Sequence, residues 1–393
     1  MNTVGIDKIS CYTPQYYLDL VTLAQMRSVE VEKYYKGLGQ YQMSILPLNE
    51  DIVTMAANAA HRLLDGHDLS HIDTVLFATE SSLDQSKAAG MFVHQLLGLP
   101  HTCRVMEIKQ ACYAGTAALQ MAVALVQQQP DRQVLVIASD YAFYGFNSTG
   151  ESSQGAAAVA MLIKVNPRLL AIDKESAYYA KDVFDFWRPP YSEVPIVDGK
   201  YSLMVYLDVA KITWKAYCDK SGRGFLDHAQ FCYHNSVPRL VEKAHQVIAD
   251  LSHVDLPSDA LEHYVQPSLR YSRQIGNCYT AALFLGIASM FDHYQGDLSH
   301  QRIGCYSYGS GCVGEFFSAV VQPGYQDVLD TDYHQTLVNT RQALTPKQYE
   351  HFGRFHEHDA EALASREIEQ NNAGTFSLLR IERHKRIYHR TGS

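Results

Sequence analysis

Short apolar runs of strand length alternate with longer helical patterns along most of the chain, and this alternation is what most constrains the fold. We predict strands at residues 74–78, 104–108, 134–138, 157–163, 231–233, 303–308 and 313–321. We predict helices at residues 88–97, 114–127, 237–248 and 278–291. Apolar strands that alternate with helices are typical of an α/β fold whose sheets are covered by helices.

The two halves of the chain share one weak sequence similarity. The segment VLVIASDYAFYG followed by GAAAVAMLI in the first half resembles IGCYSYGSG followed by VGEFFSAVV in the second. Each pair predicts a strand, a glycine turn and a second apolar strand. A single similarity can arise by chance, but it favours one duplicated unit over the two or three separate domains that 393 residues would also allow.

Composition excludes several classes of protein. With 47% hydrophobic and 19% charged residues, the bulk of the chain is not disordered. The net charge of −9 argues against nucleic acid as the main partner, since phosphate binding needs a positive surface. The longest nearly apolar run, residues 278–291, is too short to span a membrane, and residues 1–7 lack signal-peptide features. We therefore expect a cytoplasmic protein with no membrane partner.

Eight cysteines are present, and none has C-x-x-C spacing, so a zinc ribbon or a redox dithiol is not expected. Reduced thiols are typical of the cytosol. The question is then whether one of the eight is a nucleophile.

Four reactive residues follow predicted strands or lie near their ends, namely Glu80, Cys112, His234 and Ser307. In open α/β sheets, ligands bind beyond the carboxyl ends of the strands. The sequence therefore predicts one site that these residues share.

Cys112 precedes small residues that start a predicted helix, in the segment KQACYAGTAA. Free amides and the helix dipole at that position favour a thiolate, and the same amides could hold an oxyanion. The alternative is a buried cysteine that acts as a small hydrophobic residue, and that interpretation is preferred for the other seven.

Glu80 directly follows an apolar strand, where partial desolvation would raise its pKa and suit it to acid–base work. The alternative is an acid near a helix start. His234 is one of 18 histidines and stands out only through its position at a strand end. Asn277 could simply be a helix cap. Ser307 and Gly309 lie in a loop that could present amides to a carbonyl or an anion, or simply form a tight turn.

Ten short blocks in a fixed order resemble the hydroxymethylglutaryl-CoA synthase family of the thiolase superfamily. The blocks are KGLGQ at 36–40, NED at 49–51, TES at 79–81, QACYAGTA at 110–117, YGFNS at 144–148, QGAAAVAM at 154–161, DFWRP at 185–189, PIVDGK at 195–200, GNCYT at 276–280 and SYGSG at 307–311. The compact chain is similar to the bacterial mevalonate-pathway form.

The resemblance implies a thiolase-like five-layer αβαβα fold built from two related halves, 1–168 and 169–393, usually as a homodimer. It implies that Cys112 takes the acetyl group of acetyl-CoA, that Glu80 removes a methyl proton, and that His234 binds and polarises acetoacetyl-CoA. No metal or cofactor is implied.

The resemblance also implies binding residues. Asn277 and Ser307 match positions that contact the acyl chain or pantetheine, and Tyr144, Ser153 and Phe186 match pocket-lining positions. In the segment after His234 the chain departs from the family pattern: the proline is displaced to Pro238, Arg239 stands where a CoA-binding lysine is usual, and Lys243 matches a second lysine. Phe143 stands where the bacterial form often has an arginine. We expect Arg239 and Lys243 to meet the phosphates of CoA.

Three rival interpretations remain. A branching synthase of polyketide assembly would use carrier-bound acyl groups, and its carrier would favour a basic patch that this acidic chain does not show. A Cys-His-Asn ketoacyl synthase does not need Glu80. A catalytically dead scaffold or CoA-binding protein would not need Glu80, Cys112 and His234 together. For the tail after residue 330, with its basic stretch 380–390, we expect a solvated face.

Overall fold

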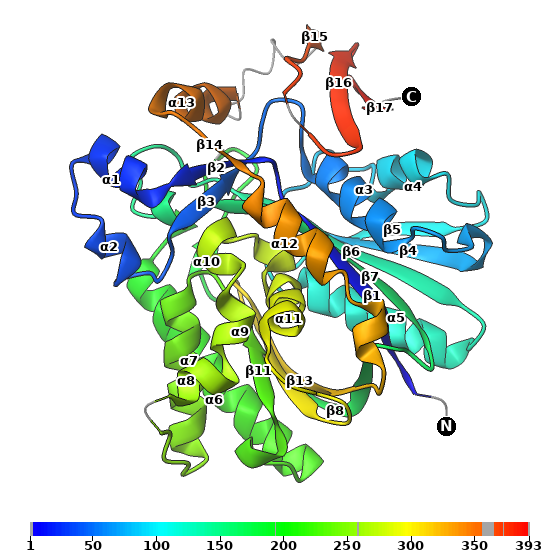
Figure 1. Cartoon of the computed structure of the whole chain (residues 1–393), viewed down its shortest axis with the longest axis vertical. Coiled ribbons are helices and arrows are strands. Elements are labelled where there is room, and N and C mark those ends of the chain that lie inside the picture. The colour runs from blue at the N-terminus through cyan, green and yellow to red at the C-terminus, as the bar shows by residue number, and fades with distance from the viewer. Residues whose placement is uncertain (1–2, 193, 258, 356–364, 372, 392–393) are drawn as a thin grey trace.

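The computed structural model describes residues 3–192, 194–257, 259–355, 365–371 and 373–391, so the outermost residues of the two predicted halves lie outside it. Within these residues, a nine-stranded mixed sheet has the order β11-β12-β13-β8-β1-β7-β6-β4-β5 (Figure 1). The strands are β1 (Val4–Tyr12), β4 (Ile72–Ala78), β5 (Arg104–Ile108), β6 (Gln133–Ala142), β7 (Gly155–Val165), β8 (Leu170–Ala180), β11 (Gln230–Tyr233), β12 (Arg302–Gly309) and β13 (Val313–Val321).

The strand pairing repeats within the sheet. In the first half, β4 is parallel to β6, β6 is antiparallel to β7, and β7 is antiparallel to β1. In the second half, β11 is parallel to β12, β12 is antiparallel to β13, and β13 is antiparallel to β8. The similarity in the sequence thus corresponds to β6–β7 and β12–β13. The boundary after residue 168 falls in the turn between β7 and β8 and stays a prediction.

Five layers follow from how the helices cover this sheet. Helices α5 (Ala114–Gln128) and α11 (Ala282–His293) form the central layer and share one core with inward-facing residues of both halves. Helices α3 (Ile52–Leu63) and α4 (Gly90–Leu97) pack on the outer face of the first half. Helices α6 (Gly199–Ser221) and α7 (Pro238–Leu251) pack on that of the second (Figure 1). The expected five-layer α/β fold is confirmed.

Side-chain alternation explains why the strands are apolar throughout. In β6, Val134, Val136 and Ala138 face the central helices, whereas Leu135 and Ile137 face α3 and α4. Successive side chains of a strand point to opposite faces, so a strand covered on both faces is apolar at every position. None of the helices in the described ranges is long and apolar enough to cross a membrane.

Smaller elements complete the fold. Strands β2 (Tyr16–Asp19), β3 (Gln42–Ile45) and β14 (Gln342–Ala343) form a second sheet, and β9 (Phe186–Trp187) pairs with β10 (Ile196–Val197). The remaining helices are α1 (Leu20–Arg27), α2 (Glu32–Tyr35), α8 (Ala260–Tyr264), α9 (Gln266–Leu269), α10 (Ser272–Ile275), α12 (Thr331–Asn339) and α13 (Pro346–Phe355).

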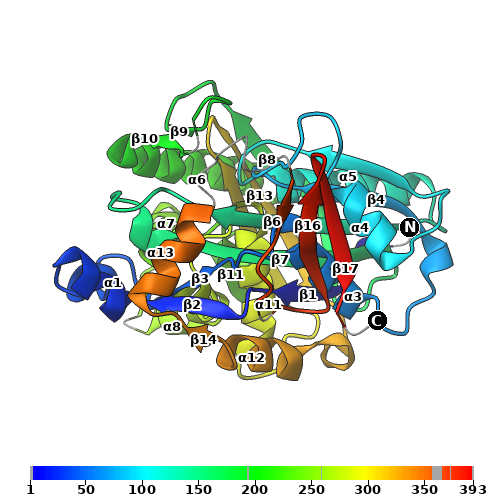
Figure 2. The ribbon, with the colours of Figure 1, turned by 90° about the horizontal axis from the view of Figure 1, so that it is seen from above.

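The solvated face predicted for residues 380–390 is only partly right, since residues 382–385 and Arg390 are exposed whereas Ile381 is buried. These residues belong to a hairpin of β16 (Phe376–Glu382) and β17 (Lys385–Arg390), which pairs with β15 (Arg366–Glu367) and lies against α3 (Figure 2). The two turn residues, Arg383 and His384, have φ of 47° and 65°. A two-residue turn with positive φ matches the twist of paired strands but normally carries Asn or Gly. Because Arg and His stand there instead, no signal in the sequence marks the turn.

Asp51 joins this hairpin to the start of α3. Its Oδ1 accepts hydrogen bonds from the backbone amides of Val53 and Thr54, which caps the helix. Its Oδ2 accepts from Nη1 of Arg386 at 3.1 Å and from the Tyr388 hydroxyl at 2.7 Å. One carboxylate thus serves both elements.

We predict that Asp51→Asn destabilises the protein by about 2 kcal/mol, because the amide keeps the cap but presents N–H groups to the donors of Arg386 and Tyr388. Urea unfolding and protease cleavage within residues 365–391 measure the effect. Asp84→Asn is the matched control, since Asp84 makes similar amide contacts at an exposed site. Equal unfolding of the two variants would contradict this account of the tail.

Candidate active site

Cys112 and Glu80 lie beside each other. Cys112 stands two residues before α5, and Glu80 stands two residues after β4. Because β4 and β5 are parallel neighbours, their carboxyl ends meet at one edge of the sheet. The Cys112 thiol donates a hydrogen bond to Oε2 of Glu80, with 3.6 Å between sulfur and oxygen. The structure thus brings these two predicted residues together.

The backbone around Cys112 is tightly constrained. Ala111 has a φ of 44°, in the left-handed region that residues with a side chain rarely adopt. A side chain on Gly115 would lie 2.6 Å from the carbonyl oxygen of Thr280, so the small residue allows α5 to approach the second half closely. The small residues after Cys112 thus allow close packing of α5 against the second half.

Asp140 on β6 fixes the position of Glu80. Its fully buried carboxylate accepts hydrogen bonds from the Glu80 amide at 3.0 Å and from the Thr79 hydroxyl at 2.7 Å. It also accepts bonds from the amide and hydroxyl of Thr280, in the short 3-10 turn before α11. Asp140 therefore joins the ends of two strands to the other half of the molecule at the site.

Burial and the neighbouring Asp140 raise the pKa of Glu80 to about 8, and the charge of Arg188 opposes this rise. The expectation of a raised pKa for Glu80 is confirmed. Burial, with the Glu80 carboxylate as the next cause, holds the pKa of Cys112 well above its usual value. The helix start was expected to favour a thiolate at Cys112, and burial together with Glu80 acts against it.

His234 follows β11 and is 4% exposed. Its amide donates to the carbonyl oxygen of Tyr306 at 2.6 Å, and the Tyr206 hydroxyl donates to the carbonyl oxygen of His234 at 2.9 Å. These bonds hold the backbone and leave the ring toward the cavity. Burial lowers the pKa of His234 to about 4, so the ring is neutral at pH 7 and keeps one N–H to donate.

A cavity of about 370 Å³ joins Cys112 to His234. Most of the predicted binding residues line it, together with aromatic side chains that the sequence did not single out. The predicted lining residues are Tyr144, Ser153, Phe186, Arg239, Lys243 and Asn277. A largely apolar cavity with a few convergent polar groups is the usual form of a small-molecule site.

Asn277 lines the cavity and closes the turn before α11, whereas the helix caps there are Cys278 and Ala281. Its Oδ1 accepts from the amide of Tyr279 at 3.0 Å, and its Nδ2 donates to the hydroxyl of Tyr144 at 3.0 Å. Its own amide donates to the carbonyl oxygen of Ser153 at 3.0 Å. Phe186 packs edge-on against Tyr144 and Tyr279.

Ser307 and Gly309 lie on strand β12 rather than in the predicted loop, and neither is among the residues that line the cavity. Alternation along β12 places Ser307 on the face of the central helices with Cys305. A side chain on Gly309 would lie 2.6 Å from the amide nitrogen of Tyr113, so the glycine lets β12 approach the turn that carries Cys112. Their direct contact with substrate stays a prediction.

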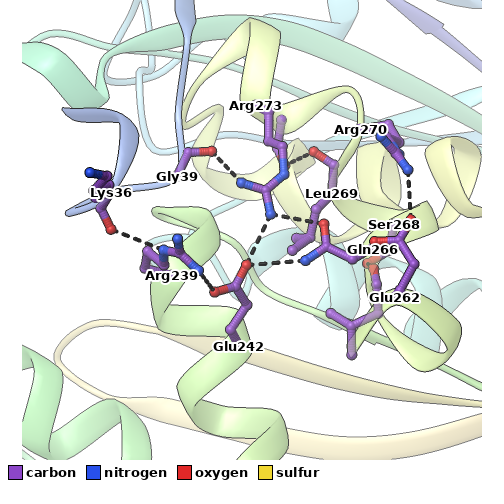
Figure 3. Close-up of polar contacts among 12 residues, drawn as sticks. Lys36, Gly39, Arg239, Glu242, Glu262, Gln266, Ser268, Leu269, Arg270 and Arg273 are labelled. Atoms are coloured by element: carbon purple, nitrogen blue, oxygen red, sulfur yellow. Dashed lines mark hydrogen bonds and ion pairs between the residues drawn. The ribbon is translucent and has the colours of Figure 1, made fainter. Parts of the chain in front are cut away.

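Arg239 is already paired within the protein. Its guanidinium donates to Glu242 and to the carbonyl oxygen of Lys36, as Figure 3 shows. Lys243 lines the cavity and makes no ion pair within the described ranges. Of the two cations expected to meet phosphates, the structure leaves Lys243 available.

Models of two protein families match nearly the whole chain. They are described as the N-terminal part of hydroxymethylglutaryl-coenzyme A synthase, at residues 1–168, and its C-terminal part, at residues 170–256 and 244–391. The hydroxymethylglutaryl-CoA synthase of Enterococcus faecalis is 40% identical over 88% of this chain and 91% of its own length. The chain belongs to the hydroxymethylglutaryl-coenzyme A synthase family.

Two further relatives of the family bear on the substrate. A polyketide biosynthesis 3-hydroxy-3-methylglutaryl-ACP synthase of Bacillus subtilis is 35% identical over 89% of this chain and 88% of its own length. A synthase solved in complex with CoA has a TM-score of 0.93 at 39% identity, covering 99% of this chain and all of the other. The chain is therefore an enzyme of the synthase family. It is more similar in sequence to the hydroxymethylglutaryl-CoA synthase of Enterococcus faecalis than to the ACP synthase of Bacillus subtilis.

Several residues at the site were not predicted to be functional. Three of them, Asp140, Arg188 and Tyr279, lie inside or near the sequence blocks that carry the resemblance. Arg188 donates through Nη2 to the carbonyl oxygen of Glu80. Tyr206 and Tyr279 line the cavity. An acid at the end of an apolar strand was the available signal for Asp140. No sequence signal places Arg188 or Tyr206, because their contacts cross long stretches of chain. Among the described residues, no group of three or more His, Cys, Asp or Glu could hold a metal ion.

Proposed function

We propose that the chain condenses acetyl-CoA with acetoacetyl-CoA to 3-hydroxy-3-methylglutaryl-CoA and CoA, as a step of isoprenoid synthesis through mevalonate. The observation that carries the proposal is the contact of the Cys112 thiol with the Glu80 carboxylate, beside a cavity that Cys112 and a neutral His234 both line. A nucleophile, a base and a hydrogen-bond donor are the three groups that this condensation requires.

The first step forms the acetyl-enzyme. The sulfur of Cys112 attacks the acetyl carbonyl carbon, and the thiol proton passes to Glu80, its hydrogen-bond acceptor. The bond to the CoA sulfur then breaks, and that sulfur takes the proton from Glu80 as free CoA forms. A carboxyl with a pKa of about 8 can both accept and return this proton near neutral pH.

The second step forms the new carbon–carbon bond. With the thiol acylated, the carboxylate of Glu80 is free to remove a proton from the acetyl methyl group. The carbanion attacks the ketone carbon of acetoacetyl-CoA, and the neutral His234 donates a hydrogen bond to the ketone oxygen. The proton that Glu80 removed from the methyl group then passes to the former ketone oxygen, which becomes the new hydroxyl, and Glu80 is a carboxylate again.

The last step is hydrolysis. Water adds to the thioester of Cys112, the carbon–sulfur bond breaks, and the product leaves with a free carboxylate while the thiol is restored. The sequence of steps neither oxidises nor reduces a carbon with an external electron carrier, so we propose that the reaction uses no cofactor.

The proposal predicts that purified protein releases CoA from acetyl-CoA and acetoacetyl-CoA, and that mass spectrometry finds the acetyl group on Cys112. Glu80→Ala is expected to acetylate more slowly, because the thiol has lost its proton acceptor, and to lose condensation by about 10³-fold, whereas Cys112→Ala is expected to lose both. Turnover only with carrier-bound acyl groups would overturn the choice of substrate. Acetyl label on another cysteine of Cys112→Ala would overturn the choice of nucleophile.

Arg188 gives a pH-dependent test. Its charge lowers the pKa of Glu80, so Arg188→Gln is expected to raise that pKa. Because the base is the ionised carboxylate, the pH of half-maximal condensation is predicted to rise by about one unit. Arg188→Lys, which keeps the charge, is the control. An unchanged pH profile in Arg188→Gln would show that Arg188 does not act on the base.

We further infer a homodimer in the cytoplasm. All eight cysteines are unpaired, which supports a reducing compartment. At one end of the sheet, β5 has an unpaired edge, and Met106 on it is 45% exposed. Exposed Met91 and Met121 lie on α4 and α5, which both contact β5. An edge strand with apolar neighbours favours pairing with a second copy.

We predict a solution mass of twice 44.2 kDa by light scattering. Met106→Lys is expected to shift the protein to the monomer, because it buries a charge in the paired edge. Met204→Lys is the matched control, since Met204 on α6 is exposed but lies on the far layer. A monomeric wild type, or a dimer unchanged by Met106→Lys, would contradict this interface.

A further inference from the structure

The irregular segment 36–41 forms part of the cavity wall. Gly37 and Leu38 line the cavity, next to Arg239 and Lys243 of α7. The segment follows α2 and precedes β3, so no helix or strand of its own fixes it. Backbone hydrogen bonds tie it to α2 and to the start of α1, and contacts with α7 and α10 hold its cavity side.

Two arginines supply these contacts through the backbone oxygens of the segment. Nε of Arg239 donates to the carbonyl oxygen of Lys36 at 3.0 Å, and Nη1 of Arg273 donates to that of Gly39 at 2.6 Å. The backbone amide of Arg239 adds a bond to the carbonyl oxygen of Leu38 at 3.0 Å. Gly39 has a φ of 75°, and a side chain there would lie 2.7 Å from Arg273, so only glycine fits.

One carboxylate serves both arginines. Glu242, with a side chain 7% exposed, accepts from Nη1 of Arg239 and, at 2.9 Å, from Nη2 of Arg273. Gln266 donates to the same carboxylate at 3.2 Å (Figure 3). A buried carboxylate with several charge-assisted bonds is a strong acceptor, and removal of one partner of such a group is costly.

The ion pair between Glu242 and Arg239 decides which cation of α7 is available in the cavity. Arg239 and Lys243 are four residues apart, so they lie one above the other on one face of the helix. Arg239 has Nε and Nη1 engaged, and Glu242 offsets its charge only in part because Arg273 shares the same carboxylate. Within the part of the chain that the structure describes, Lys243 has no ion-pair partner.

We propose that Glu242 is a specificity-determining residue: it holds Arg239 in the cavity wall as a positioning residue and leaves Lys243 as the cation of α7 that binds the phosphates of CoA. The inference rests on the proposed function, since CoA is the anionic ligand. It replaces the expectation that both cations act as phosphate contacts.

The test is a double-mutant cycle read by equilibrium binding of CoA itself to the full chain at several salt concentrations. Lys243→Gln is expected to weaken CoA binding by about tenfold and to reduce its salt dependence. Arg239→Gln is expected to reduce the salt dependence less than Lys243→Gln does and to weaken binding by less than about twofold. Arg270→Gln is the matched control, because Arg270 pairs with Glu262 on the surface and touches no residue of segment 36–41.

The Glu242→Gln background completes the cycle. There Arg239 loses its partner and can turn to the phosphates, so adding Arg239→Gln is expected to weaken CoA binding by about five- to tenfold and to reduce the salt dependence. Thermal unfolding checks that each variant is folded, and Glu242→Ala serves if the glutamine variant is not.

Two results would overturn the inference. The first is an equal loss of affinity and of salt dependence in Arg239→Gln and Lys243→Gln in the wild-type background. The second is an identical effect of Arg239→Gln with and without Glu242. Failure of the proposed function gives a different result, because the wild type would then not bind CoA at all.

Discussion

The buried carboxylate of Asp140 is the interaction on which the site depends. It lies on β6 and collects donors from the end of β4 and from the turn before α11, which belong to different halves of the molecule. A buried charge is tolerable only when it is fully hydrogen-bonded, so these donors cannot move independently of it. Asp140 therefore fixes the backbone of Glu80 and, by its own charge, helps to raise the pKa of that base.

Around this centre, burial outweighs the helix dipole. A dipole at a helix start stabilises a charge by at most about 2 kcal/mol, whereas burial of a thiolate beside a carboxylate disfavours that charge more strongly. Cys112 therefore rests as a thiol that donates to Glu80, and its proton is already placed for transfer. Burial in the same low-polarity surroundings keeps His234 neutral. Burial thus sets the protonation of Cys112, Glu80 and His234 alike.

Continuous apolar or small-residue stretches predicted several strands and helix starts correctly. The strands at 74–78 and 134–138 and the helix start after Cys112 were found because each is apolar or small over a continuous stretch. The central pairing of β1 with β8 was missed because it joins positions far apart in the chain. The hairpin at 376–390 was hidden by its charges, and the engagement of Arg239 depends on Glu242, whose role no spacing reveals. Contacts across long chain separations explain these misses, but some local elements were missed as well: helices α3 and α6 and strand β1 were not among the predictions.

The most direct test of the Glu80–Cys112 pair is the pH dependence of Cys112 alkylation, followed by mass spectrometry of its own peptide. The account predicts that alkylation rises only at alkaline pH, above that of an ordinary thiol. It also predicts that Glu80→Gln shifts the rise to lower pH, because the opposing charge is gone. Full reactivity of Cys112 at neutral pH in the wild type, unchanged in Glu80→Gln, would contradict it.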